Sequence, residues 1–546
     1  MDSVEVALAM LLAVVISGYL VRILPLSLPL PLVQIALGAA IAGVSSHGVK
    51  LDPDIFFLLF LPPLLFLDGW RIPKSDLFRD KATILELVLG LVLFTVVGAG
   101  FMIHWLIPTM PLAVAFALAA IVSPTDPVAV SSITARVPMP KRLMHILEGE
   151  SLLNDASGLV CFRFAVAAAL TGSFSLASAS LTFLWISAAG IGIGVSFTLA
   201  VTRAQVWLSR HFGEESGAPI LINLLIPFGS YLLAEHLQAS GILAAVAAGI
   251  TMSYVELSGR AHATTRLHRA AVWTTIQFGL NGVMFVLLGE QLPSIVLGAV
   301  DSIEQSGHMN AWWLAVFAVA ISLGLTLLRL VWVWTSLSLT LFRARHRGQQ
   351  VTKPRVRLVL AASLAGARGA ITLAGVMTLP LVMRDGTPFP ARDLAIFLAS
   401  MAILLSLVMA SIGLPKLLKG LDLPDEPARQ VEEDRARREA AITAIAAVEK
   451  AQHVVRQNAD AEICARAAAL VIALYQRRLD RAAPGSGVEA GNLRQADEAE
   501  RALRLAGLQA ERERIFSLAR QAQISDETSR KLVHEIDLLE SRHRSV

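Results

Sequence analysis

The stretch ESLLNDASG at 150–158 places two carboxylic acids, an amide and a hydroxyl inside an otherwise apolar segment that continues as LVCFRFAVAAAL. On a helix, Ser151 and Asp155 lie on one face, and Glu150 and Asn154 share the adjacent face. Hard oxygen donors of this kind suit a dehydrated monovalent cation. An unpaired charge inside a lipid-spanning helix costs about 2.5 to 3.5 kcal/mol, so these acids need partners or a function.

Asp155 is the group in this cluster that could change its protonation state. Burial disfavours the charged form of a carboxyl group. Asp155 would therefore hold a proton while it is empty and release that proton when a cation arrives. A carboxylate that holds either a proton or a cation, but not both, predicts an exchanger, because competition at one group couples the two ions.

Glu150 needs a different partner. Arg368 always carries a positive charge, and a buried ion pair between Glu150 and Arg368 would neutralise both groups. If the segment around Thr125 is unwound, the carbonyl and hydroxyl oxygens of Thr125 could add to the shell around a cation bound at Asp155.

Two apolar segments contain residues that interrupt a helix. In SPTDPVAV at 123–130, Pro124 and Pro127 each remove a backbone donor and clash with the preceding turn. In AASLAGARGAITLAG at 361–375, glycines weaken a helix that also carries Arg368. Unwound backbone at membrane depth is tolerated only inside protein or along a cavity. A pair of interrupted spans in two halves of a chain indicates the ion site of an inverted-repeat transporter.

The elements that must position these residues are membrane spans. The chain is 55% hydrophobic and only 16% charged, with a mean hydropathy of +0.61, which is far from the usual range of soluble domains. A span needs about 20 apolar residues. We predict thirteen such runs, at 4–24, 29–45, 55–70, 83–106, 112–134, 150–171, 181–202, 218–237, 240–257, 271–292, 311–342, 357–381 and 392–418.

An odd number of spans puts the two termini on opposite sides of the membrane. One set of alternate loops contains nineteen lysines and arginines and the other set contains three. Because cytoplasmic loops carry the excess of positive charge, the N-terminus is predicted outside and the C-terminal tail in the cytoplasm. The start, MDSVEVALAM, lacks the basic region of a cleaved signal peptide, so the first helix is expected to be retained. The expected location of the protein is the plasma membrane of a bacterium.

The C-terminal tail has a different composition from the rest of the chain. It mixes charges with apolar residues at three-to-four spacing, which predicts amphipathic helices, and PGSG at 484–487 separates two helical groups. The predicted fold is therefore an all-α polytopic membrane protein with a transmembrane exchanger domain at 1–418 and a cytoplasmic α-helical domain at 419–546. For the tail, a bundle that packs on itself or on a second copy is favoured over a ligand or pH sensor.

Several classes of function are disfavoured. The net charge of +4 comes with basic residues spread over short loops, which does not predict nucleic-acid binding. Cys161 and Cys464 suggest neither a disulfide framework nor a metal site. The sequence contains no GxxxxGK[ST] loop, which disfavours an ATP-driven pump, and no filter-like repeat, which disfavours a channel. An enzyme and a resident cofactor are not expected, and a membrane sensor remains a remote alternative.

Four motifs of this chain resemble those of the monovalent cation:proton antiporters, in the bacterial NhaP-type branch that is related to the eukaryotic sodium/proton exchangers. The motifs are LPPLLFLDG at 61–69, SPTDPVAV at 123–130, EGESLLNDASG at 148–158 and GARGAITLAG at 366–375. The resemblance covers roughly residues 1–418. It implies a homodimer in which each protomer has a dimerisation part and a six-helix core that moves like an elevator.

The resemblance also implies roles for individual residues. Asp155 would bind the transported cation with help from Ser151, from the main chain of Thr125 and from Asp68. Some relatives have a glutamate where Asp68 stands, so a water could bridge this shorter side chain to the ion.

Three further roles concern the shape of the site. Asn154 would shape the site and link it to the unwound segments, Asp126 would compensate the helix ends there, and Glu150 would pair with Arg368. The electrogenic branch has a second aspartate in place of Asn154, so the asparagine implies electroneutral exchange of one cation for one proton.

The resulting hypothesis is exchange of sodium for protons in pH and sodium homeostasis, with lithium as a surrogate. Potassium/proton exchange at the same site is the alternative, because these ligand types do not separate the two ions. Of the other charges, Arg163 is expected in a structural pair with an interior acid. Arg329 is expected to extend toward the membrane interface, and Glu235 and Glu290 are expected at a solvated rim.

Overall fold

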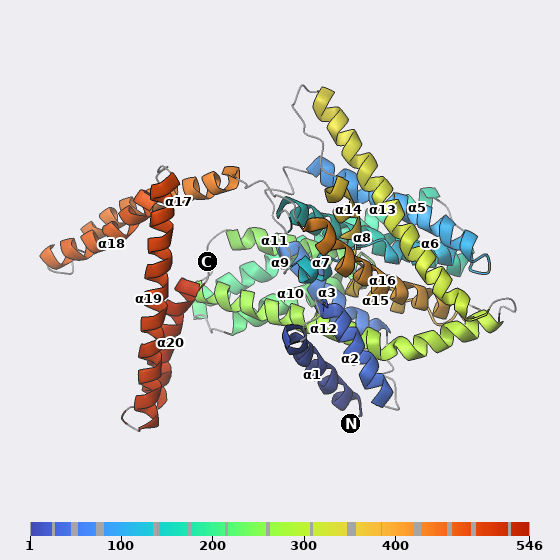
Figure 1. The fold of residues 1–546 in the computed structure, drawn as a ribbon, viewed down its shortest axis with the longest axis horizontal. Helices are drawn as coiled ribbons and strands as arrows, with labels where there is room; N and C mark the ends of the chain where they lie inside the picture. The colour runs from blue at the N-terminus through green and yellow to red at the C-terminus, as the bar shows by residue number, and fades with distance from the viewer. Residues whose placement is uncertain are drawn as a thin grey trace. The chain divides into compact units, whose positions relative to one another are not determined.

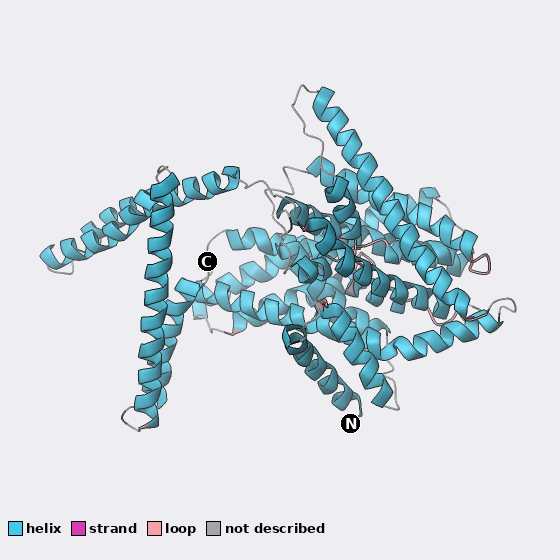
Figure 2. Ribbon diagram, in the orientation of Figure 1, coloured by secondary structure: helices cyan, strands magenta, loops and turns pink. Residues whose placement is uncertain are grey.

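The structure is a computed structural model in which every regular element is a helix among the residues that it describes (Figure 2). The described residues are 2–23, 28–44, 53–71, 81–134, 139, 141–172, 176–212, 217–257, 263–305, 310–346, 356–383, 385–419, 427–455, 461–481, 487–521, 523 and 526–544. The chain separates into two compact units, residues 1–421 and 422–546. The predicted all-α architecture is confirmed.

The first unit contains the apolar helices, which are labelled in Figure 1. Their bounds are α1 Asp2–Ile23, α2 Leu30–Val44, α3 Pro53–Arg71, α5 Lys81–Leu106, α6 Leu112–Val122, α7 Pro127–Thr134, α8 Lys141–Thr171, α9 Leu176–Phe212, α10 Ala218–His236, α11 Gly241–Leu257, α12 Ala263–Gln305, α13 Trp312–His346, α14 Val356–Leu364, α15 Ala370–Met377 and α16 Arg392–Leu418.

Many of these helices carry large apolar side chains on their outer surface. Trp105, Trp185 and Phe212 are more than 70% exposed, as expected where lipid rather than water is the solvent. Within the described residues, six helices are long and apolar enough to cross a membrane, and five apolar helices are shorter. The chain is a multi-pass membrane protein, and the count of thirteen spans stays a prediction.

The closest packing divides the first unit into two sets of helices. The first helix group, α1–α3 and α9–α12, is joined by extensive contacts of α12 with α2 and of α11 with α3 and α9. The second helix group, α5–α8 and α13–α16, is joined by contacts of α6 with α8, α5 with α6 and α13, and α14 with α16. Contacts of α12 with α16 and of α3 with α15 connect the two groups.

Small residues allow the closest of these approaches. A Cβ atom added at Gly38 of α2 would overlap the Val286 carbonyl oxygen of α12, and one added at Gly289 of α12 would overlap the Ile35 carbonyl oxygen of α2. The two backbones are therefore in direct contact, which is how helices associate where lipid gives no hydrophobic driving force. This contact fixes α12 against the rest of the first helix group.

The described residues of the second unit form four helices that pack in pairs. The bounds are α17 Pro427–Val455, α18 Ala461–Arg481, α19 Gly487–Arg520 and α20 Asp526–Arg544, with α17 packed on α18 and α19 on α20. Arg512 of α19 pairs with Asp537 at 2.8 Å and with Glu540 of α20. The predicted separator lies mostly outside the described residues, because only its last residue, Gly487, is described.

Candidate cation site

Two breaks in the helices lie at the positions that the sequence predicted. α6 ends at Val122 and α7 begins at Pro127, while α14 ends at Leu364 and α15 begins at Ala370. The two breaks touch each other, since the Asp126 backbone N–H donates to the Ala367 carbonyl at 2.7 Å. Four helix ends therefore meet inside the second helix group, and each end carries a partial charge.

Asp126 lies where the positive ends of two of these helices meet. Its Oδ1 accepts a hydrogen bond from the Ala129 backbone N–H at 3.3 Å, as an N-cap of α7 does. Its Oδ2 occupies the space next to Gly369, the residue before α15, where an added Cβ would overlap it. A carboxylate in this place stabilises both helix starts.

Arg368 lies where the negative ends meet. Its Nε donates to the Val122 carbonyl at 2.9 Å, its Nη1 donates to the Gly366 carbonyl at 2.6 Å, and its backbone N–H donates to Ser406 Oγ at 3.0 Å. Val122 is the last residue of α6, so the guanidinium neutralises the carboxyl end of that helix. Arg368 is only 4% exposed, and these carbonyls replace the water that it has lost.

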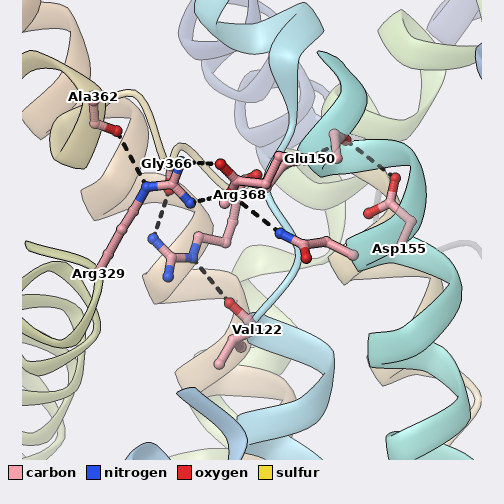
Figure 3. Close-up of polar contacts among 10 residues, drawn as sticks. Val122, Glu150, Asp155, Arg329, Ala362, Gly366 and Arg368 are labelled. Atoms are coloured by element: carbon pink, nitrogen blue, oxygen red, sulfur yellow. Dashed lines mark hydrogen bonds and ion pairs between the residues drawn. The ribbon is translucent and has the colours of Figure 1, made fainter. Parts of the chain in front are cut away.

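Glu150 is paired with Arg329 of α13, as Figure 3 shows. Arg329 Nη1 and Nη2 donate to the two carboxylate oxygens at 2.5 and 3.1 Å, and Arg329 Nε donates to the Ala362 carbonyl at 3.2 Å. The expected pair of Glu150 with Arg368 is therefore wrong, because two helix-end carbonyls hold the Arg368 guanidinium. The expectation that Arg329 extends to the membrane interface is also wrong, since this residue is 3% exposed.

Asn154 connects this ion pair to the rest of α8. Its Nδ2 donates to Glu150 Oε1 at 3.2 Å, and the residue has no exposed surface. Its Oδ1 is buried and has no hydrogen-bond partner among the described residues. Asn154 therefore contacts the buried pair from the position on α8 next to Asp155, and its role in shaping the site stays a prediction.

A small cavity lies in front of Asp155. Its volume of about 30 Å³ is large enough to hold a water-sized particle, since about 10 to 15 Å³ is enough for a water molecule. Ser151 Oγ donates to the Thr125 carbonyl at 2.7 Å and lies 3.4 Å from Asp155 Oδ2. These three residues are each 3 to 4% exposed. The cavity is lined by Leu64, Asp68, Pro124, Thr125, Asp126, Pro127, Ser151, Asp155, Gln277, Asn281, Gly369, Ala370, Ile371 and Thr372.

The cavity combines sequence-predicted residues with residues that the sequence did not single out. Asp155, Ser151, Thr125 and Asp68 all line it, although α3, the break between α6 and α7, and α8 are separate in the chain. Gln277 and Asn281 of α12 and Thr372 of α15 were not predicted. In the sequence these three residues could have been noticed as polar residues within apolar segments, with Gln277 and Asn281 four residues apart. The cavity lies between the two helix groups, because α3 and α12 belong to the first group and the other lining elements to the second.

Three other charged residues that the sequence analysis singled out, Arg163, Glu235 and Glu290, lie outside the cavity lining. Arg163 pairs with Glu235 of α10 at 3.0 Å, and their side chains are 46% and 35% exposed. Arg163 therefore has a structural pair as expected, but its partner is a partly exposed acid and not an interior one. Glu290 is 4% exposed, so its expected position at a solvated rim is wrong.

Replacing Gly369 with alanine is expected to impair the site. The new Cβ would overlap the Asp126 carboxylate, which must move away from the starts of α7 and α15. We expect a loss of about 1 to 3 kcal/mol of stability, as for other overpacked sites, together with strongly reduced ion exchange. Thermal unfolding in detergent and ion-exchange assays in vesicles measure the two effects. Gly192→Ala is the control, because nothing lies within 4 Å of its added Cβ. Equal behaviour of the two variants would contradict the assigned position of Asp126.

Comparison of the sequence with known proteins finds transporters. A model of the family described as "Sodium/hydrogen exchanger, transmembrane" matches residues 10–420. The protein named "Uncharacterized Na(+)/H(+) exchanger YjcE" from Escherichia coli is 40% identical over 541 residues, which cover 98% of this chain and 97% of the relative. The "Sodium, potassium, lithium and rubidium/H(+) antiporter" of Bacillus subtilis is 38% identical over 544 residues, which cover 99% of this chain and 78% of the relative.

The fold is also similar to a solved structure. The sodium proton antiporter MjNhaP1 from Methanocaldococcus jannaschii at pH 8 superposes with a TM-score of 0.58 at 19% sequence identity. The match covers 77% of this chain and 99% of the solved chain. At this identity the likeness concerns the arrangement of the helices.

Proposed function

The chain belongs to the sodium/hydrogen exchanger family, and we propose that it exchanges sodium ions for protons across the plasma membrane at the Asp155 cavity, one ion for one proton. The observation that carries this proposal is the cavity itself. It brings the Asp155 carboxylate, the Ser151 hydroxyl and the Thr125 segment around a space for a single small particle. Hard oxygen donors around such a space suit an alkali cation.

The coupling follows from competition at Asp155. The carboxylate is 3% exposed, so it is poorly solvated and has to be neutralised by a proton or by a cation. A cation that enters displaces the proton, and a proton that returns displaces the cation. Ser151 orients the site, because its hydroxyl donates to the Thr125 carbonyl and leaves its own lone pairs for the ion. Asp68 lines the same cavity and would reach the ion directly or through a water.

One-for-one exchange is supported by the neutral neighbour of Asp155. Asn154 adds no titratable group, and the nearby Glu150 is already neutralised by Arg329. A single proton-binding carboxylate on α8 would leave no net charge movement in a cycle that exchanges one cation for one proton.

Potassium is the alternative substrate. The Bacillus subtilis relative is named as an antiporter of sodium, potassium, lithium and rubidium, which supports a site that tolerates several alkali ions. We place sodium and lithium first because the family model that matches this chain is described as a sodium/hydrogen exchanger.

The remaining assignments complete the proposal. The exchanger domain spans residues 1–418, and residues 419–546 form a cytoplasmic helical domain, with the N-terminus outside the cell. The protein works as a homodimer in the bilayer, and the transported cations and protons are its substrates rather than resident cofactors.

Everted membrane vesicles from cells that lack their own antiporters test this proposal. A respiration-driven pH gradient is set up, and a quenched pH-sensitive dye reports the proton efflux that follows addition of sodium, lithium or potassium. We expect dequenching with sodium and lithium. Valinomycin with potassium, which clamps the membrane potential, should leave the rate unchanged if exchange is electroneutral. Dequenching with no cation, or a current without proton counterflow, would contradict antiport.

A further inference from the structure

Two amide side chains of α12 form part of the wall of the Asp155 cavity. Gln277 and Asn281 are four residues apart on one face of this helix, and both line the cavity. The rest of that helix is apolar enough to span a membrane. Polar groups in such a helix are costly and usually mark an ion pathway. The proposed function gives neither residue a role.

The two amides differ in what their oxygen atoms can do. Gln277 Oε1 accepts a hydrogen bond from Arg71 Nη1 at 2.5 Å, and Arg71 Nη2 also donates to Thr274 Oγ1 at 3.2 Å. The carbonyl oxygen of Gln277 is therefore engaged by a guanidinium at the end of α3. This bond makes the Gln277 oxygen less available to a cation, and the NH₂ group of the same amide does not ligate one. Asn281 lies one turn further along the helix and is the α12 residue that can contribute an oxygen.

We propose that Asn281 is a cation-binding residue that sets the preference of the site among alkali metal ions, with Gln277 and Arg71 positioning this wall. The proposal rests on the proposed function of the Asp155 cavity. In it, Asp155, Ser151 and Thr125 supply oxygens from the second helix group, and Asn281 supplies a neutral oxygen from the first.

A neutral ligand in this place affects small cations most. Small ions hold their water more tightly and bind each oxygen ligand more strongly, so the loss of one oxygen leaves more of their dehydration cost uncompensated. The number and field strength of the ligands decide which alkali ion a site favours. Loss of one carbonyl oxygen therefore weakens lithium and sodium binding more than potassium binding. Because α12 and α8 belong to different helix groups, the shell is complete only when the two groups are close.

The test compares Asn281→Leu with Asn281→Asp in everted vesicles. The leucine fills the space without an oxygen, while the aspartate keeps an oxygen at the same position. For each variant the cation concentration that gives half-maximal dequenching and the maximal rate are measured with lithium, sodium and potassium. Thr275→Val is the matched control, since Thr275 is exposed on the same helix and its hydroxyl donates to the Ala271 carbonyl of the preceding turn.

For Asn281→Leu we expect the half-maximal sodium and lithium concentrations to rise about tenfold, the effect of losing one ligand, and the potassium value to rise less. The maximal rate should stay within about twofold of the native rate, because Asp155 still exchanges the proton. Asn281→Asp should retain the order of preference among the three ions, and Thr275→Val should match the native protein.

Three outcomes would overturn the inference. The first is an unchanged half-maximal sodium concentration in Asn281→Leu, and the second is an equal change of the half-maximal concentration for all three ions. The third is a loss of maximal rate without a change in the half-maximal concentrations, as a structural role would give. If Asn281→Leu does not accumulate in the membrane, Asn281→Ala is measured in the same way and decides by the same criteria. Failure of the native protein to exchange any cation would instead refute the proposed function itself.

Discussion

Asp155→Asn is expected to reduce cation-dependent dequenching to the level of vesicles that lack the protein. The asparagine has nearly the same shape and volume as the aspartate, so the fold should be retained. It cannot bind and release a proton, and its neutral oxygen does not provide the charge that a dehydrated cation needs. The measurement is the dye assay with sodium, lithium and potassium, at matched amounts of protein in the membrane.

The control for this prediction is Asp385→Asn. Asp385 lies in the segment between α15 and α16, where its side chain accepts hydrogen bonds from Thr387, and it is exposed. The same chemical change there should leave exchange intact. If Asp155→Asn retained counter-transport at the native rate, competition at this carboxylate could not be the coupling mechanism.

Removal of one partner of the Glu150–Arg329 pair is the second change with a large expected effect. Arg329→Gln leaves the Glu150 carboxylate buried without its bidentate partner, and breaking a buried pair in this way costs about 3 to 5 kcal/mol. We expect a large fall in the thermal stability of the detergent-solubilised protein. Arg163→Gln is the control, because its partly exposed pair with Glu235 contributes less than about 1 kcal/mol.

A double-mutant cycle identifies the partner of Glu150. If the charges of Glu150 and Arg329 interact directly, the double variant Glu150→Gln with Arg329→Gln should lose less stability than the sum of the two single variants. Each single variant leaves one buried charge without its partner, and the double variant leaves none. The cycle of Glu150 with Arg368 should show a smaller coupling, since Arg368 bonds mainly to backbone carbonyls. A larger coupling with Arg368 than with Arg329 would contradict the structure.

Local features of the chain were sufficient to predict much of the site. Pro124 and Pro127 predicted where one helix breaks, because a proline acts on its own turn whatever packs around it. The spacing of Ser151 and Asp155 predicted that they share a face, because helical geometry alone fixes that relation. The motifs that resemble the antiporter family then indicated that Thr125 and Asp68 belong with them, and all four line one cavity.

The sequence by itself determined the helical class, the interrupted segments and the face of α8 that carries Asp155, since these follow from composition and from spacing within one turn. Only the tertiary structure decided which distant residue lies opposite each of these groups. Glu150 faces Arg329, which is 179 residues away in the chain, while Arg368 serves helix-end carbonyls. The packing of α12 also brings Asn281 to the cavity, which the sequence did not predict. Either arginine has the charge to neutralise Glu150, and only the placement of α13 and of the break between α14 and α15 decides which of them reaches it.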